Sequence, residues 1–377
     1  MAMNTPIIIL DEPVAAIDPE GAKDIYNLLV NLNKRYNKTI IVREMQSMKM
    51  IVYSCSAEER PLFARYAGQF GAELTLLAEK PVLENAHLAA GMDAVNILSA
   101  TCITPEILDV YKTCGVRMVV SRTVGVEHVD TAYANSIGIA VGNAPYSPAS
   151  VADYAIMMML MVLRCIKPML LRYAGQDYTP RGYLGRELPN MTVGILGLGR
   201  IGETTARHLQ GFGCRVLAYD RREKPALRGV AEQTDLDTVY RESDILSLHL
   251  AAAPETYHFI DSAAIAKMKD GAVLINTARG TLVDNAALID ALERGKLSGA
   301  GLDVFDGDRP IYYRDFKNQV LAQRDMAVLS AMPNVLMLPH MAYYTDQAAE
   351  DMVRNSLDGA ARYLAGQEDP WLIGEMV

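Results

Sequence analysis

The sequence predicts an α/β protein made of two doubly wound domains, one of which is inserted into the other. Three observations lead to this expectation. Apolar, strand-like runs alternate with helical segments along most of the 377 residues. A glycine-rich turn directly follows one of these runs, and a last helical segment, Asp346–Leu364, follows the final one. Alternation of this kind is typical of parallel sheets covered by helices.

The first block of alternating segments begins at Lys49, and a helix is expected near Pro105–Thr113. Its strand-like runs are 50–53, 73–77, 94–98 and Met118–Ser121. The run Pro145-Tyr146-Ser147-Pro148 then interrupts the alternation, and an apolar helix expected over 151–166 follows it. We expect this helix to lead from one domain into the other.

A second block begins at Met191 and predicts a complete doubly wound sheet of six strands. The expected strands are Thr192–Leu196, Arg215–Tyr219, Ile245–Leu248, 273–276, 300–303 and 335–338. We expect the last helical segment to return to the first domain. The predicted division is an extension at 1–47, one domain at 48–146 and 341–377, and a second domain at 147–340.

The composition excludes several classes of protein. A net charge of -9 offers no basic face for nucleic acid or for an anionic membrane. The longest apolar run, 155–163, is too short to span a bilayer, and residues 1–5 lack the basic region of a signal peptide. The five cysteines are scattered and form no Cys-x-x-Cys pair. We therefore expect a cytoplasmic protein without a metal site and without a nucleic-acid or membrane partner.

The glycine-rich turn, Gly197-Leu198-Gly199-Arg200-Ile201-Gly202, lies between an apolar strand and a helical segment. Glycines at this spacing allow a tight turn, a close approach of backbone to pyrophosphate, and close helix–strand packing. Asp220 ends the next strand, where a carboxylate can accept hydrogen bonds from ribose hydroxyls and repels a 2′-phosphate. Together these features predict an NAD site that includes Arg200 and Ile201. A tight turn that binds no ligand is the alternative.

Several longer motifs occur at 121–130, 146–154, 194–202, 276–280, 301–305 and 338–345. Together they resemble the D-2-hydroxyacid dehydrogenases. The resemblance is to the D-lactate and D-hydroxyisocaproate dehydrogenase branch, which includes the D-lactate-forming enzyme of vancomycin-resistance clusters. The motifs occur in the order of the family, and the resemblance extends from Lys49 to Ala365. It therefore implies two Rossmann-like domains, with a cofactor domain inserted into a discontinuous substrate domain.

The resemblance implies three catalytic residues for reduction of a 2-keto acid. Arg279 corresponds to the cation that binds the substrate carboxylate, and a planar guanidinium suits that role. His340 corresponds to the proton donor, and an imidazole titrates near neutrality. The other five histidines are expected to be structural or exposed. The family usually has glutamate where this chain has Asp308, and we expect Asp308 to pair with His340 and raise its pKa.

The resemblance also implies residues around the reacting groups. On the substrate side these are Leu98, Val124, Gly125 and Tyr146. On the cofactor side they are Leu250, Ala251, Thr256, Thr277, Ala278 and Asp303. Lactate-preferring relatives have tyrosine about where this chain has Leu98. We therefore expect branched or aromatic 2-keto acids to be accepted at least as well as pyruvate.

Residues 1–47 resemble a different family. Residues 6–13 and 15–19 look like the Walker B strand and the following loop of an ABC-transporter ATPase, and 39–42 looks like the strand before that family's switch histidine. The histidine is absent, and no G-x-x-x-x-G-K-[ST] loop occurs in the chain to bind ATP phosphates. We expect a truncated, non-functional fragment, with an interaction role as the alternative.

The motifs together predict reversible, NAD-dependent reduction of a small 2-keto acid to a D-2-hydroxy acid. The D configuration and a homodimer through the cofactor domains rest on the resemblance alone. A non-catalytic, NADH-sensing protein of corepressor type with the same fold is the alternative. An ATPase subunit is a third possibility, and the missing phosphate loop argues against it.

Overall fold

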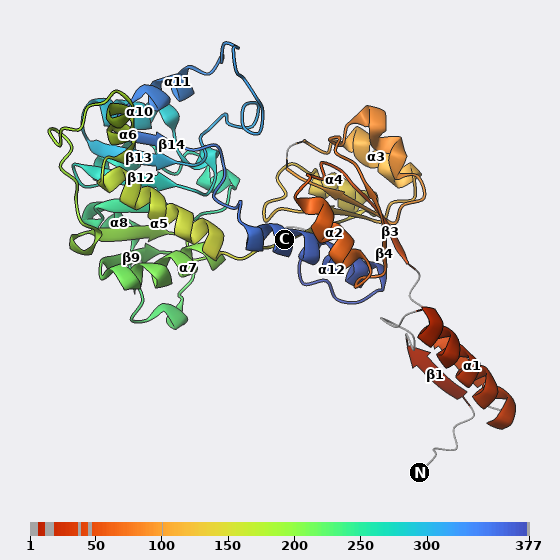
Figure 1. Cartoon of the computed structure of the whole chain (residues 1–377). Coiled ribbons are helices and arrows are strands. Elements are labelled where there is room, and N and C mark those ends of the chain that lie inside the picture. The colour runs from red at the N-terminus through yellow and green to blue at the C-terminus, as the bar shows by residue number, and fades with distance from the viewer. Residues whose placement is uncertain (1–6, 12–18, 37–38, 44–46, 100, 375–377) are drawn as a thin grey trace. The chain divides into compact units, whose positions relative to one another are not determined.

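The computed structural model describes residues 7–11, 19–36, 39–43, 47–99 and 101–374 (Figure 1). The chain forms two compact units: unit 1 comprises Met1–Tyr146 and Asp346–Val377, and unit 2 comprises Ser147–Thr345. The sequence places the second boundary five residues earlier, after His340. Residues 341–345 group with unit 2 because the backbone N–H groups of Met341 and Ala342 each donate to the carboxylate of Asp303 at 2.9 Å.

The described part of unit 1 contains a five-stranded parallel sheet in the order β4-β3-β5-β6-β7. The strands are β3 (Met48–Val52), β4 (Ala72–Leu76), β5 (Ala94–Ile97), β6 (Met118–Ser121) and β7 (Ala140–Asn143). The first four coincide with predicted strands to within two residues. Strand β7 is not predicted, because its four residues include Gly142 and form no apolar run.

Helices cover both faces of this sheet, because successive side chains of a strand point to opposite sides. Ile51, Val95 and Val119 pack in one core with α3, α4 and η1, whereas Val52 and Met118 pack in another with α2 and α12. The bounds are α2 (Glu59–Ala67), η1 (Leu83–Ala89), α3 (Pro105–Thr113), α4 (Thr131–Ser136) and α12 (Asp346–Leu364). Unit 1 is thus a complete three-layer α/β body.

The described part of unit 2 contains a seven-stranded parallel sheet in the order β10-β9-β8-β11-β12-β13-β14. Six of its strands match the predicted ones, and the short edge strand β10 is additional. The strands are β8 (Thr192–Leu196), β9 (Arg215–Tyr219), β10 (Glu232–Gln233), β11 (Ile245–Leu248), β12 (Ala272–Asn276), β13 (Leu297–Leu302) and β14 (Val335–Met337). The strand order reverses at β8, and ligands bind at such a switch point in open α/β sheets.

Two hydrophobic cores lie on the two faces of this second sheet. Met158 and Met159 of α5 are fully buried in one of them together with residues of α7. Residues of α8, α9 and α10 form the other. The helices are α5 (Ala149–Leu163), α6 (Ile166–Ala174), α7 (Arg200–Leu209), α8 (Leu236–Glu242), α9 (Ser262–Lys267), α10 (Asn285–Glu293) and α11 (Arg324–Ala331).

The apolar helix after the Pro145–Pro148 run is shorter than the sequence predicts. Helix α5 ends at Leu163, and α6 begins at Ile166 after a break of two residues. Cys165 adopts a left-handed conformation with φ of 52°, which an α-helix cannot continue through. In the part of the chain described here, no single helix is long and apolar enough to cross a membrane; α5 and α6 pass that test only as a pair, which is bent by 65°.

The N-terminal extension contains two parallel strands and a helix. Strand β1 (Ile7–Asp11) pairs with β2 (Thr39–Arg43), and α1 (Pro19–Tyr36) connects them. Of the stretch 15–19, which resembles the loop of the ATPase family, residues 15–18 lie outside the described residues.

Candidate active site

The glycine loop joins β8 to α7, and its glycines differ in what surrounds them. Gly197 has φ of +93°, and a Cβ there would lie 2.7 Å from the carbonyl oxygen of His249. A Cβ on Gly202 would lie 2.0 Å from the carbonyl oxygen of Gly197. Gly199, the residue that precedes α7, faces open space. The outer glycines therefore serve packing, whereas the middle one leaves room for a pyrophosphate at the helix N-terminus.

Asp220 lies directly after β9, where its carboxylate is held against the glycine loop. One carboxylate oxygen accepts a hydrogen bond from the backbone N–H of Leu198 at 2.7 Å, and the other accepts from that of Arg222 at 2.9 Å. Each oxygen has a second lone pair for a ribose hydroxyl. This geometry suits recognition of the adenosine ribose.

The other predicted cofactor residues follow the carboxyl ends of β11 and β12. The hydroxyl of Thr277 is buried and has no hydrogen-bond partner among the described residues, as expected of a group that meets a bound ligand. Thr256 instead hydrogen bonds within its own loop, donating to the carbonyl oxygen of Ala251 at 2.8 Å and accepting from the N–H of Ala253. Leu250 is half-buried and packs against the core of unit 2. The open Gly199 and the unpaired Thr277 hydroxyl thus fit a dinucleotide.

Arg279 follows β12 on a turn that the buried side chain of Asn276 organises. The Asn276 amide accepts from the N–H of Ala278 at 3.0 Å and donates to the carbonyl oxygen of Arg279 at 2.9 Å. The Arg279 guanidinium donates to the carbonyl oxygen of Ala278 at 2.9 Å and is half-buried. The backbone of Arg279 is therefore fixed at the carboxyl edge of the sheet, which is the edge where the glycine loop also lies.

Asp308 lies beyond β13 in an environment that disfavours its charge. Burial raises the pKa of Asp308 to about 6; the nearby Asp306 also raises it, while Arg309 and Arg279 lower it. Its carboxylate is 3.4 Å from the backbone N of Phe305, which is a weak contact. Asp306 instead interacts with His258, at 2.9 Å from Nε2. The two acids of the Asp306-Gly307-Asp308 run thus have different partners.

His340 follows β14 and has a left-handed backbone, with φ of 57°. Its N–H donates to the carbonyl oxygen of Asp303 at 2.8 Å, and the next two N–H groups donate to the Asp303 carboxylate. Asp303 is fully buried, and burial raises the pKa of its carboxyl although these N–H groups oppose the shift. Asp303, which the sequence predicts as a cofactor residue, therefore also holds the turn that carries His340.

The other described histidines interact with neighbouring side chains, are buried, or are exposed to solvent. His208 interacts with Asp153 at 2.7 Å, and His128 lies 3.0 Å from the hydroxyl of Ser121. Burial lowers the pKa of His249 to about 4, so its imidazole is neutral at physiological pH. His87 is exposed on η1. No group of residues that could hold a metal ion occurs in the described ranges.

The predicted substrate-side residues belong to unit 1 and follow its strands. Leu98 comes directly after β5 and is half-buried, and Tyr146 is the last residue of the unit's first segment. Val124 and Gly125 follow β6 on a loop whose backbone carbonyl groups accept two side-chain hydrogen bonds. Asn143 donates to the carbonyl oxygen of Val124 at 2.7 Å, and the Thr123 hydroxyl donates to that of Gly125 at 2.6 Å.

Sequence reasoning misses the residue that anchors this loop. Arg122 is fully buried and donates to Glu59 at 2.9 Å, to the Asn96 side chain at 2.7 Å and to the carbonyl oxygen of Tyr53 at 3.1 Å. The available signal is a charged residue directly after a strand with four buried positions. Its partners are 26 to 69 residues away, so the sequence does not identify them.

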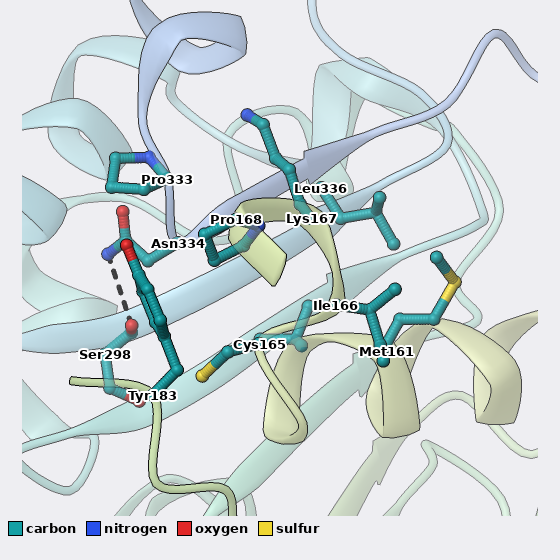
Figure 2. A pocket seen from close by; sticks show the side chains of 11 residues that line it. Met161, Cys165, Ile166, Lys167, Pro168, Tyr183, Ser298, Pro333, Asn334 and Leu336 are labelled. Atoms are coloured by element: carbon teal, nitrogen blue, oxygen red, sulfur yellow. Dashed lines mark hydrogen bonds between the residues drawn. The ribbon is translucent and has the colours of Figure 1, made fainter. Parts of the chain in front are cut away.

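A separate hollow of about 140 Å³ lies where the α5–α6 junction meets β13 and β14 (Figure 2). Cys165, Tyr183 and Leu336 are among the residues that line it. Lys167 donates to the carbonyl oxygens of Ser330, Met332 and Val335 at 2.6 to 2.7 Å. The hollow contains none of the predicted catalytic or cofactor residues.

Comparisons with known proteins identify the family of the chain. The family described as D-isomer specific 2-hydroxyacid dehydrogenase, NAD binding domain, matches residues 156–342. The D-specific alpha-keto acid dehydrogenase of Enterococcus faecalis is 38% identical, over 83% of this chain and 95% of its own length. The aromatic 2-oxoacid reductase of Clostridium sporogenes is 36% identical, over 82% and 94%. The structure of Lactobacillus jensenii D-lactate dehydrogenase with NAD+ aligns with a TM-score of 0.77 at 33% identity, over 87% of this chain and 100% of that one.

The doubly wound sheet and its glycine loop define an NAD-dependent oxidoreductase. The chain belongs to the D-2-hydroxyacid dehydrogenase family. It is an NAD-dependent enzyme that interconverts 2-keto acids and D-2-hydroxy acids. The predicted fold class, cofactor and reaction class are thereby confirmed.

The raised pKa of Asp308 predicts a pH-dependent effect on stability. An unfolded aspartate titrates near 4, so the folded protein loses stability as the pH rises through about 6 and Asp308 ionises. Asp308→Asn should therefore be more stable than the wild type at pH 7.5, by about 1–3 kcal/mol. Thermal unfolding of the variant and the wild type at pH 7.5 and pH 4 tests this. The difference in stability between the two proteins should be smaller at pH 4. An Asp308→Asn variant that is less stable than the wild type at pH 7.5 would contradict the prediction. Asp237→Asn is the control, because Asp237 is an exposed carboxylate paired with Lys267.

Proposed function

We propose that Arg279, Asp308 and His340 carry out the reduction of a 2-keto acid by NADH. The observation that supports this most is their common position. All three follow the carboxyl ends of β12, β13 and β14, which are neighbours in the sheet that also presents the glycine loop. Parallel strands bring such residues to one edge, where ligands of doubly wound folds bind.

In this proposal Arg279 binds the substrate carboxylate through its guanidinium, which fixes the orientation of the keto group. His340, as imidazolium, donates a proton to the keto oxygen, and it takes the proton back in the reverse direction. NADH, when bound, supplies the hydride that C2 accepts. Asp308 as a carboxylate favours the protonated imidazole, a role supported by its charge and by its position after β13. From the resemblance, we also propose that Val124 and Gly125 of unit 1 bind the substrate through their backbone N–H groups.

Substitution of the two principal residues tests the assignment. Arg279→Lys keeps the charge but loses the planar fork, so kcat/KM for the keto acid should fall about 10²–10³-fold. His340→Gln should lower kcat by about 10²–10⁴-fold, since general acid catalysis is lost. Both variants should keep NADH binding, measured by fluorescence titration. Arg294→Lys and His208→Gln, which alter exposed ion pairs of the same unit, are matched controls. Wild-type kcat in His340→Gln would refute the assignment.

We further propose that 2-keto acids with branched or aromatic side chains are accepted at least as well as pyruvate. Leu98 supports this, because a leucine leaves more room than the tyrosine of lactate-preferring relatives. The similarity to a reductase named for aromatic 2-oxoacids adds support. NADH is therefore expected to be consumed with phenylpyruvate and 2-ketoisocaproate at least as efficiently as with pyruvate.

Initial rates with the three keto acids test this preference. A kcat/KM for pyruvate tenfold above both others would refute it. Leu98→Tyr should move the preference toward pyruvate by roughly 10-fold, the order of discrimination that a small change in pocket volume gives. Leu88→Tyr, at an exposed position of η1, is the control and should leave the preference unchanged.

Assembly, location and the extension complete the proposal. We propose a homodimer and a cytoplasmic location; the latter agrees with five cysteines that are all free thiols. Light scattering at micromolar concentration should give twice the 41.3 kDa chain mass.

Residues 1–47 hold none of the residues assigned above, so we propose that they take no part in the reaction.

A further inference from the structure

Two bulky residues of unit 2 share an unusual backbone conformation and lie against each other. Tyr313 and His340 have φ of 64° and 57°, in the left-handed region that residues with a large side chain rarely adopt. Such a residue costs on the order of 1–3 kcal/mol, which the surrounding structure must offset. Residues strained in this way concentrate at functional sites. Their direct contact therefore singles out this pair.

The contact consists of a hydrogen bond and a ring contact. The Tyr313 hydroxyl donates to the backbone carbonyl oxygen of His340 at 2.9 Å. The two ring centroids are 5.9 Å apart with a tilt of 34°, and the His340 ring is also 6.4 Å from that of Tyr343. On the other side of the turn, Asp303 accepts from the N–H of His340. The backbone of His340 is thus held at its N–H by Asp303 and at its carbonyl by Tyr313.

Tyr313 is itself presented by a well-anchored turn. The preceding residues, Ile311 and Tyr312, are buried with Phe305 in a small core, and their N–H groups each donate to the carbonyl oxygen of Asp308 at 2.9 Å. The Tyr313 residue is 46% exposed, so global packing does not require its side chain. The same turn therefore carries Asp308 at one end and Tyr313 at the other.

We propose that Tyr313 is a positioning residue that holds the imidazole of His340 in the orientation needed for proton transfer. This inference rests on the proposed role of His340 as proton donor. The hydroxyl fixes the backbone of His340, and the tyrosine ring limits the rotation of the imidazole. Loss of the hydroxyl should slow the proton-transfer step and leave binding of the dinucleotide unchanged, because no part of Tyr313 belongs to the glycine loop or to Asp220.

Tyr313→Phe tests the hydroxyl and Tyr313→Leu tests the ring. Loss of one neutral hydrogen bond predicts a fall in kcat of about 3–10-fold in Tyr313→Phe, and Tyr313→Leu should fall further. The solvent deuterium isotope effect on kcat should rise in both, since proton transfer becomes more rate-limiting. The Kd for NADH should stay within twofold. Rates are expressed per NADH-binding site, so that unfolded molecules do not count.

Two further variants separate the possible outcomes. Tyr178→Phe, an exposed tyrosine 71% accessible, should behave like the wild type. An unchanged kcat and isotope effect in Tyr313→Phe, with His340→Gln inactive, would overturn the inference and leave the proposed function standing. An active His340→Gln would overturn both. A lower kcat accompanied by equally weakened NADH binding would also overturn the inference, because it would indicate a general structural role.

Discussion

The parallel pairing of β8, β11, β12, β13 and β14 is the constraint on which the site in unit 2 depends. Parallel strands all end at one edge, so the residues that follow them meet there however far apart they are in the chain. The glycine loop, Arg279, Asp308 and His340 span more than 140 residues of sequence and reach that edge in this way. Close packing at the loop, where Gly202 approaches the carbonyl of Gly197, fixes where a dinucleotide can enter.

Two buried aspartates of this edge show how the same side chain serves different purposes. Asp303 accepts hydrogen bonds from the backbone N–H groups of Met341 and Ala342, which oppose the rise in pKa that its burial causes and hold the turn after β14. Asp308 has one weak backbone contact, so burial dominates and its pKa rises to about 6. A carboxyl with a pKa of about 6 changes its charge near neutral pH, as groups that take part in proton transfer do. The shorter side chain in place of glutamate is therefore compatible with a role in proton transfer.

Prediction from sequence succeeds for features that local residues determine. The glycine loop and Asp220 are recognisable because backbone geometry requires those residue types at that spacing. Among the described residues, ten predicted strands of the two large sheets and the two strand-like segments of the extension are found, whereas β7 and β10, which are short and polar or glycine-containing, are missed. The helix after Pro148 is predicted to end at Ile166 but ends at Leu163, because the left-handed conformation of Cys165 cannot be recognised in its apolar pattern.

The sequence by itself determined the doubly wound fold, the dinucleotide loop, and Arg279 and His340 as candidates, because each has a local motif around it. Only the tertiary structure decided how those candidates are held. The bracing of His340 by Asp303 and Tyr313, the burial of Asp308 and the network around Arg122 all join residues distant in sequence. Which residues come into contact is decided by the packing of strands and loops at the sheet edges. A local pattern in the sequence does not specify that packing, because the partners are far apart in the chain.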